Sequence, residues 1–200
     1  MKNFITTKNL LFTSLFFALI LIFASCEKDP ISEEITSVDA NAKASPASQQ
    51  SDLSIVAIAE ADGRFTTLLS LLEQTGLKPM FETGTDQYTV FAPTDDAFAT
   101  FLEENPTLDP TDNELLTAVL TYHVTEGQRF SNSVLGKKSA KEIETVNGAS
   151  IYVDSKGDID TNDEDMIFDD ASILVEAGLF DIAASNGVIH VIDAVLVPTE

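Results

Sequence analysis

The spacing of apolar residues predicts a helical first half for the globular part of the chain. Over residues 64–76, apolar side chains recur at i, i+3, i+4 and i+7 and end at a glycine: Phe65, Leu68, Leu69, Leu72 and Gly76. We expect three further helices, over residues 54–60, after Thr94 and after Thr111. The Thr94 hydroxyl can cap its helix, whose expected apolar face is Ala97, Phe98, Phe101 and Leu102.

The pattern then changes to strands. Runs of β-branched and aromatic residues predict strands over residues 88–92, 143–146, 151–153, 173–175 and 188–197, with another starting near Tyr122. Asn147-Gly148 between two of these runs predicts a hairpin whose two turn residues both have positive φ. The last run is nearly continuous in apolar residues, which is typical of a central, covered strand. This order of elements predicts an α+β fold.

The N-terminus has the pattern of an export signal. Lys2 and Lys8 precede an apolar run over residues 10–24, which ends at a polar cluster. The run is shorter than the ~20 residues that a membrane-spanning helix needs. We therefore expect residues 1–25 to be a signal peptide that is removed, with an uncleaved anchor as the alternative.

Cys26 is the single cysteine of the chain, and it follows Ala24 and Ser25. These small residues resemble a lipobox, although Phe23 stands where leucine is usual. The resemblance implies that Cys26 is acylated and inserts in a membrane. Glu27-Lys28-Asp29 is similar to the tag of surface-exported lipoproteins in Bacteroidetes-type bacteria. The expected location is the outer membrane, facing the cell surface, with the periplasmic face as the alternative.

Residues 26–51 are rich in Ser, Ala and acids and contain no aromatic residue, so we expect a disordered tether. A flexible chain of about twenty residues spans on the order of 25 Å. Residues 52–200 are then the size of one domain. If Cys26 is acylated, this domain contains no thiol for a disulfide, a thiolate zinc site or a cysteine nucleophile.

The chain is strongly acidic. It contains 33 Asp and Glu against 11 Lys and Arg, for a net charge of −22, and loss of residues 1–25 removes two lysines and no acid. Such a charge repels phosphate backbones, so we expect no nucleic-acid partner. Cations and basic surfaces are the favoured partners, although most of the acids are expected to serve solubility.

Three stretches together resemble the fasciclin (FAS1) family: residues 88–98 (YTVFAPTDDAF), Tyr122-His123 and residues 186–198 (NGVIHVIDAVLVP). The resemblance covers one domain, from Asp52 to Pro198. It implies a FAS1-like β-wedge of about seven strands with helices packed around it, and an adhesion or binding module that is not an enzyme. It also implies binding residues at Tyr122, His123, Asp181 and Ile182, with a protein or polysaccharide as ligand.

Two patterns leave room for other chemistry. His123 and His190 are the only histidines, and they could form a metal pair or an acid–base group, or lie buried and hydrogen-bonded. No further zinc ligands, Gly-x-Ser-x-Gly elbow or His-Glu-x-x-His pair accompanies them. No catalytic residue is therefore predicted.

The acidic loop 154–170 places oxygen ligands at positions 1, 3, 5, 7 and 12 of a calcium loop: Asp158, Asp160, Asn162, Glu164 and Asp169. Against calcium, Asp163 replaces the turn glycine, and a solvated loop is the other interpretation.

The favoured function is a lipid-anchored adhesion or matrix-binding module of the cell envelope. The alternative is a periplasmic lipoprotein that binds calcium or a small ligand through this loop.

Overall fold

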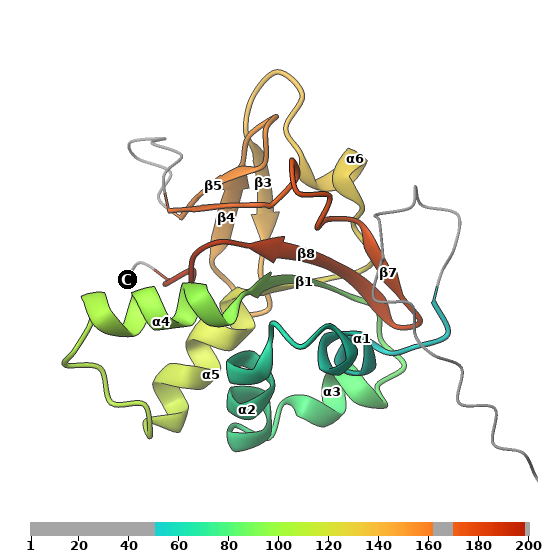
Figure 1. Ribbon diagram of the computed structural model, residues 1–200. Helices are drawn as coiled ribbons and strands as arrows, with labels where there is room; N and C mark the ends of the chain where they lie inside the picture. Colours follow the sequence, from blue (N-terminus) through green and yellow to red (C-terminus); the bar gives the residue numbers. More distant parts are fainter. Residues whose placement is uncertain (1–50, 162–169, 199–200) are drawn as a thin grey trace, which may run out of the picture. The chain divides into compact units, whose positions relative to one another are not determined.

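The computed structural model describes residues 51–161 and 170–198 (Figure 1). The predicted signal peptide, Cys26 and the predicted tether up to residue 50 lie outside the described residues. The described helices are α1 (Ile55–Asp62), α2 (Thr66–Gln74), α3 (Lys78–Glu82), α4 (Asp95–Glu104), α5 (Asn113–Tyr122) and α6 (Ser131–Val134). The described strands are β1 (Tyr88–Pro93), β2 (Val124–Glu126), β3 (Lys141–Glu144), β4 (Ser150–Val153), β5 (Asp158–Asp160), β6 (Ala171–Ser172), β7 (Ile182–Ala184) and β8 (Gly187–Ile192).

The strands form two four-stranded sheets. The first has the order β2-β1-β8-β7, in which β1 and β8 are parallel and the outer pairs are antiparallel. The second is an antiparallel sheet in the order β3-β4-β5-β6. The α+β class is confirmed, with eight strands among the described residues where about seven were expected.

The β1–β8 pair lies between two hydrophobic cores. Its register runs from Tyr88 opposite Gly187 to Pro93 opposite Ile192, and all six residues of each strand are buried. In Figure 1 the helices α1–α5 lie below this pair and the second sheet lies above it. Because successive side chains of a strand point to opposite faces, Val90 belongs to the helical core and Phe91 to the core under the second sheet. Burial on both faces explains the nearly continuous apolar run of β8.

Asn186-Gly187 brings three elements together at the start of β8. The Asn186 side chain accepts a hydrogen bond from the Ile55 amide (2.9 Å) and donates one to the Phe81 carbonyl (2.8 Å). At Gly187, a Cβ atom would lie 2.1 Å from the Tyr88 carbonyl oxygen, so only glycine fits without a shift of β1. This part of the fasciclin-like motif is therefore structural.

The predicted helices are confirmed, with caps that agree with the sequence. Ser54 caps α1 and Thr94 caps α4, each by accepting a backbone N–H three residues on. Helices α3 and α6 were not expected; they span only five and four residues, too few to show a helical period. Leu102 was wrongly assigned to the buried face of α4, because it is 46% exposed.

Several strand predictions need correction. Tyr122 ends helix α5 and His123 is its C-cap, so β2 begins only at Val124. In the β3–β4 hairpin, Gly148 has positive φ and Asn147 does not. The loop is therefore a three-residue turn and not the predicted two-residue turn. A hydrogen bond from the Thr145 amide to the Ala149 carbonyl (3.0 Å) closes it.

The last two predicted strands are shorter than expected. β8 ends at Ile192 instead of continuing to residue 197, and beyond Ser172 the predicted 173–175 strand is reduced to a single bridge between Ile173 and Ile192. Ile173, Val195 and Leu196 are buried without continuing a ladder, whereas Val197 is 41% exposed, so apolar content indicated full or partial burial for most of these residues but not strand pairing. No helix within residues 51–161 or 170–198 is long and apolar enough to cross a bilayer.

Asp95 supports the start of α2 from a neighbouring helix. The N-cap residue of α2, Phe65, makes no side-chain cap, and the Asp95 carboxylate instead accepts hydrogen bonds from the amides of Thr66 (3.2 Å) and Thr67 (2.7 Å). Partial desolvation raises the pKa of Asp95, but these hydrogen bonds lower it by more, so its pKa lies below the usual value. The stabilisation is thus present at neutral pH and is lost as pH falls through this lowered value.

We predict that Asp95→Ala lowers the free energy of unfolding at pH 7 by about 1–2 kcal/mol, the usual cost of losing a cap. Asp96→Ala is the matched control, because Asp96 lies in the same first turn of α4 but is exposed and accepts none of these bonds. Urea unfolding followed by circular dichroism measures both. Equal losses in the two variants would contradict the capping role.

Candidate functional site

Tyr122 of the predicted binding pair is fully buried. Its exposure is 0%, it belongs to the core under the second sheet, and its hydroxyl donates to the Ser150 carbonyl at 2.9 Å. Burial raises the pKa of Tyr122 to about 12, with smaller contributions from nearby acids. The phenol therefore stays protonated and ties α5 to strand β4.

His123 is buried as well, at 2% exposure. Its Nε2 accepts the Leu196 amide at 2.9 Å, so the proton is on Nδ1, which donates to the Val119 carbonyl at 2.8 Å. Burial lowers the pKa of His123 to about 4, although the hydrogen bond to Val119 opposes the shift. The neutral ring ties the end of α5 to the C-terminal segment, which confirms the interpretation of a buried, hydrogen-bonded histidine.

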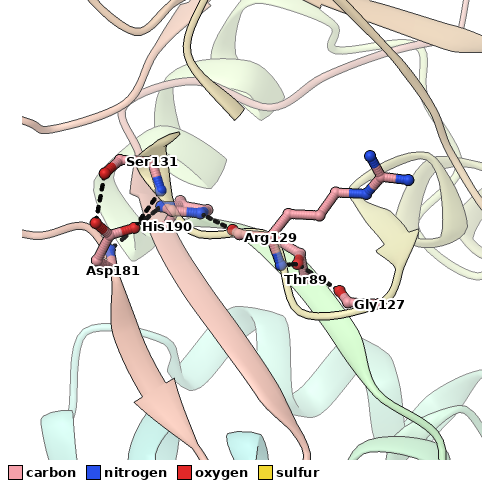
Figure 2. A network of polar contacts seen from close by, with 6 residues as sticks. All are labelled: Thr89, Gly127, Arg129, Ser131, Asp181 and His190. Atoms are coloured by element: carbon pink, nitrogen blue, oxygen red, sulfur yellow. Dashed lines mark hydrogen bonds and ion pairs between the residues drawn. The ribbon is translucent and has the colours of Figure 1, made fainter. Parts of the chain in front are cut away.

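His190 is the second buried histidine, and it lies at the centre of the polar network in Figure 2. Its Nδ1 accepts the Asp181 amide (3.3 Å), so Nε2 carries the proton and donates to the Arg129 carbonyl (2.8 Å). Its ring stacks on Phe91 with centroids 5.7 Å apart. Burial lowers the pKa of His190 despite the Arg129 bond and the Asp181 charge, so its 4.0 Å approach to the Asp181 carboxylate is not an ion pair at neutral pH.

Asp181 fixes the start of α6. Its carboxylate accepts hydrogen bonds from both the amide and the hydroxyl of Ser131, each at 2.5 Å (Figure 2). Asp181 itself has φ of 54°, a left-handed conformation that aspartate tolerates better than most residues. These two bonds help hold that backbone in place.

A second arm of the network runs through Thr89 on β1. The Thr89 hydroxyl donates to the Gly127 carbonyl (2.7 Å) and accepts the Arg129 amide (2.8 Å). Together with the His190 and Asp181 bonds, this fixes residues 127–131 onto the first sheet (Figure 2). We call this the 127–131 segment.

Ser131, Asp181 and His190 are the residue types of a serine-hydrolase triad, but their arrangement differs. The Ser131 hydroxyl bonds to the carboxylate, not to the imidazole, and the imidazole Nε2 bonds to a backbone carbonyl. A triad needs the histidine to accept the serine proton. The bonds of this network hold backbone segments together, and none of them activates Ser131 as a nucleophile.

The four predicted binding residues do not form one exposed surface. Tyr122 and His123 are inside the domain, and Ile182 is a half-buried residue of β7 that packs on the helical core. Asp181 is half-buried, with its carboxylate bonded to Ser131. Because their side chains are buried, Tyr122 and His123 can affect binding only through the backbone that they position. The sequence could not show this, since residue type alone does not tell whether a side chain is buried.

A model of the fasciclin domain matches residues 63–198 of the chain. The protein belongs to the fasciclin family. It is 33% identical over 142 residues to an uncharacterized protein of Synechocystis, covering 71% of this chain and 96% of that one. It is 31% identical to human periostin over 139 residues, covering 70% of this chain but 15% of periostin.

A solved structure of a FAS1 domain pair from the insect cell adhesion molecule Fasciclin I is similar with a TM-score of 0.55. That likeness has 14% identity and covers 72% of this chain and 50% of the other, so it supports the fold alone. The sequence motifs thus predicted the family correctly.

The sequence did not predict that Arg129, Ser131 and Thr89 belong to the polar network. Their contacts join residues about 40 or more positions apart and leave no local signal.

Two of the five residues of the predicted calcium motif lie in the described part of this fasciclin domain. Asp158 and Asp160 lie in strand β5, where the Asp158 carboxylate accepts the Ser172 hydroxyl at 2.8 Å, and not in a tight loop. Asn162, Glu164 and Asp169 lie outside the described residues. Within residues 51–161 and 170–198, no group of three or more His, Cys, Asp or Glu side chains is placed to hold a metal ion. Calcium binding by the acidic loop stays a prediction.

The buried neutral His123 predicts loss of stability in acid. Above pH 6.5 the ring is neutral in both the folded and unfolded states; below it the unfolded state takes up a proton first, until the folded pKa of about 4 is reached. The loss over this range is about 3 kcal/mol. Urea unfolding at several pH values between 7.5 and 4 should show a steeper decline for the wild type than for His123→Gln.

The comparison isolates one residue, because every other ionisable group is the same in both proteins. His123→Gln should be less stable at pH 7.5, since it loses packing and the bond to Val119, and the two curves should converge toward pH 4. Parallel curves would show that His123 does not titrate in this range.

Proposed function

We propose that this fasciclin-family protein is a lipid-anchored adhesion or matrix-binding module of a bacterial cell envelope, without catalytic activity. Its acylated Cys26 would insert in the outer membrane, with the domain facing the cell surface. Its partner would be a protein or a polysaccharide. Membership of the fasciclin family supports the adhesive part, since one family member, Fasciclin I, is named as an insect cell adhesion molecule.

The observation that carries the proposal is the internal pairing of the polar network. Asp181, His190, Ser131 and Thr89 bond to one another or to backbone atoms, and both histidines have lowered pKa values. Groups held in this way fix the conformation of the surface above them, whereas a catalytic site needs a side chain that is free to transfer a proton or to attack a substrate. A preorganised surface suits recognition because it lowers the ordering cost of binding.

The anchor and the tether fit this function. A tether of about twenty residues reaches on the order of 25 Å and keeps the domain clear of the lipid headgroups. Many copies on one surface then act together, so weak single contacts can add to firm attachment.

We predict that Cys26→Ser abolishes labelling of the protein by palmitate and moves it from the membrane fraction to the soluble fraction. Ser25→Ala is the control, since it keeps a small residue before the cysteine and should keep the label. Cys26 is the only cysteine, so no other thiol can replace it. Retention of label in Cys26→Ser would contradict the anchor.

The adhesive role has its own measurement. Protease treatment of intact cells should remove the wild-type domain, and cells that express Cys26→Ser should attach to matrix or to one another less than wild-type cells. Unchanged attachment with normal expression would contradict the adhesive function even if the anchor is correct.

A further inference from the structure

An open hollow of about 670 Å³ lies along residues 129–141, next to the 127–131 segment. Four of its ten lining residues are cations: Arg129, Lys137, Lys138 and Lys141. None of the ten is an acid. We call this feature the basic hollow.

The basic hollow concentrates a scarce charge. The whole chain contains 33 acidic and 11 basic residues. Seven of these basic residues lie in the described part of the chain, and four of the seven line the hollow. The other three are Arg64, Lys78 and Lys156. The four cations of the hollow lie within 13 consecutive residues of a chain that is otherwise strongly acidic, so the hollow is a local site of anion attraction.

The cations of the hollow are also unpaired with acids. Arg64 is paired with Asp62 (2.5 Å) and Lys78 with Glu60 (3.0 Å). Within the described parts of the chain, no acid lies within 4.0 Å of the cationic groups of Arg129, Lys137, Lys138 or Lys141. The three lysines are exposed, so their charges are available to a ligand.

The backbone that carries these charges is held in place. The amide and carbonyl of Arg129 bond to Thr89 and His190, while its side chain leads away from the network (Figure 2). Gly136 donates its amide to the Asp154 carbonyl (3.1 Å), and a Cβ atom there would lie 2.3 Å from the Ser139 carbonyl oxygen. The buried network described above therefore supports one wall of the hollow.

The chemistry of the lining selects among anions. Besides the cations it presents the Asn132 amide and the hydroxyls of Ser133 and Ser139, which can bond to sugar hydroxyls. It contains no aromatic residue on which a nucleobase could stack. The strongly negative net charge of the chain disfavours densely charged partners such as duplex DNA or an anionic bilayer. A hydrated chain with well-spaced charges fits best.

We propose that the basic hollow binds an acidic polysaccharide through its carboxylate or sulfate groups. This inference rests on the proposed function, for which it names the class of partner. The ligand charges approach the lysines at the rim and Arg129, while Asn132, Ser133 and Ser139 bond to the sugar hydroxyls.

The test uses the mature chain, residues 26–200, with Cys26→Ser to keep it soluble, and measures its binding by calorimetry. Polygalacturonate probes carboxylate groups, κ-carrageenan, which carries a single sulfate on each disaccharide, probes sulfate groups, and neutral dextran is the uncharged control. We expect binding to one or both charged polymers, none to dextran, and weaker binding in 0.5 M salt.

The variant Lys137→Gln, Lys138→Gln, Lys141→Gln should lower the affinity about tenfold. Its matched control is Arg64→Gln, Lys78→Gln, Lys156→Gln, which changes the net charge equally outside the hollow and should change the affinity less than about twofold. All of the hollow substitutions are at exposed positions, so the variant should fold normally, and circular dichroism checks this.

Equal affinities in the two variants, or no binding to either charged polymer, would overturn the proposal. Tighter binding to duplex DNA or to phosphatidylserine vesicles would overturn the assignment to a polysaccharide. Cells that attach normally with the hollow variant but not with Cys26→Ser would leave the adhesive function intact and place its contact elsewhere. Attachment unaffected by Cys26→Ser would remove the adhesive function, while binding in solution would still support the hollow.

Discussion

The parallel pairing of β1 with β8 is the constraint on which the rest of the domain depends. The two strands come from segments about 100 residues apart, and their side chains alternate between two hydrophobic cores. Because both faces are covered, every position of the pair must be buried, and the polar ones must be bonded internally. Thr89 and His190 are those polar positions, and they bond to the 127–131 segment.

The binding residues implied by the family therefore have a different physical meaning in this structure. Tyr122 and His123 lock the end of α5 to β4 and to the C-terminal segment, and His190 with Asp181 locks the 127–131 segment. Loss of any of them would disturb the surface that the backbone presents. A binding defect after such a change is then compatible with a positioning role and does not require direct contact.

Charge divides the roles within the domain. The large acidic excess keeps the surface soluble and repels dense polyanions. The basic hollow is the local exception, and its wall is supported by the same network that the buried β1–β8 pair requires. Fold stability and the proposed recognition are thus connected through Arg129, whose backbone belongs to the network and whose side chain belongs to the hollow.

The sequence alone determined what depends on local chemistry. Helical spacing with the Ser54 and Thr94 caps predicted α1, α2, α4 and α5, and the motifs at residues 88–98 and 186–198 predicted the family. The expected export signal and the acylation of Cys26 rest on the same kind of local pattern and stay predictions. Such features depend on residues within a few positions of one another, so the order of residues along the chain is enough to predict them.

Tertiary structure decided the rest. Burial of Tyr122 and His123 and placement of Asp158 and Asp160 in a strand depend on how distant segments meet. The cations of the hollow come from one stretch, residues 129–141, but the distant residues Thr89 and His190 hold the backbone of Arg129 in place. A polar residue has the same identity whether it is exposed or buried, and only its packing decides which. The sequence therefore predicted the family, but only the fold could show which of its residues are exposed and which hold the domain together.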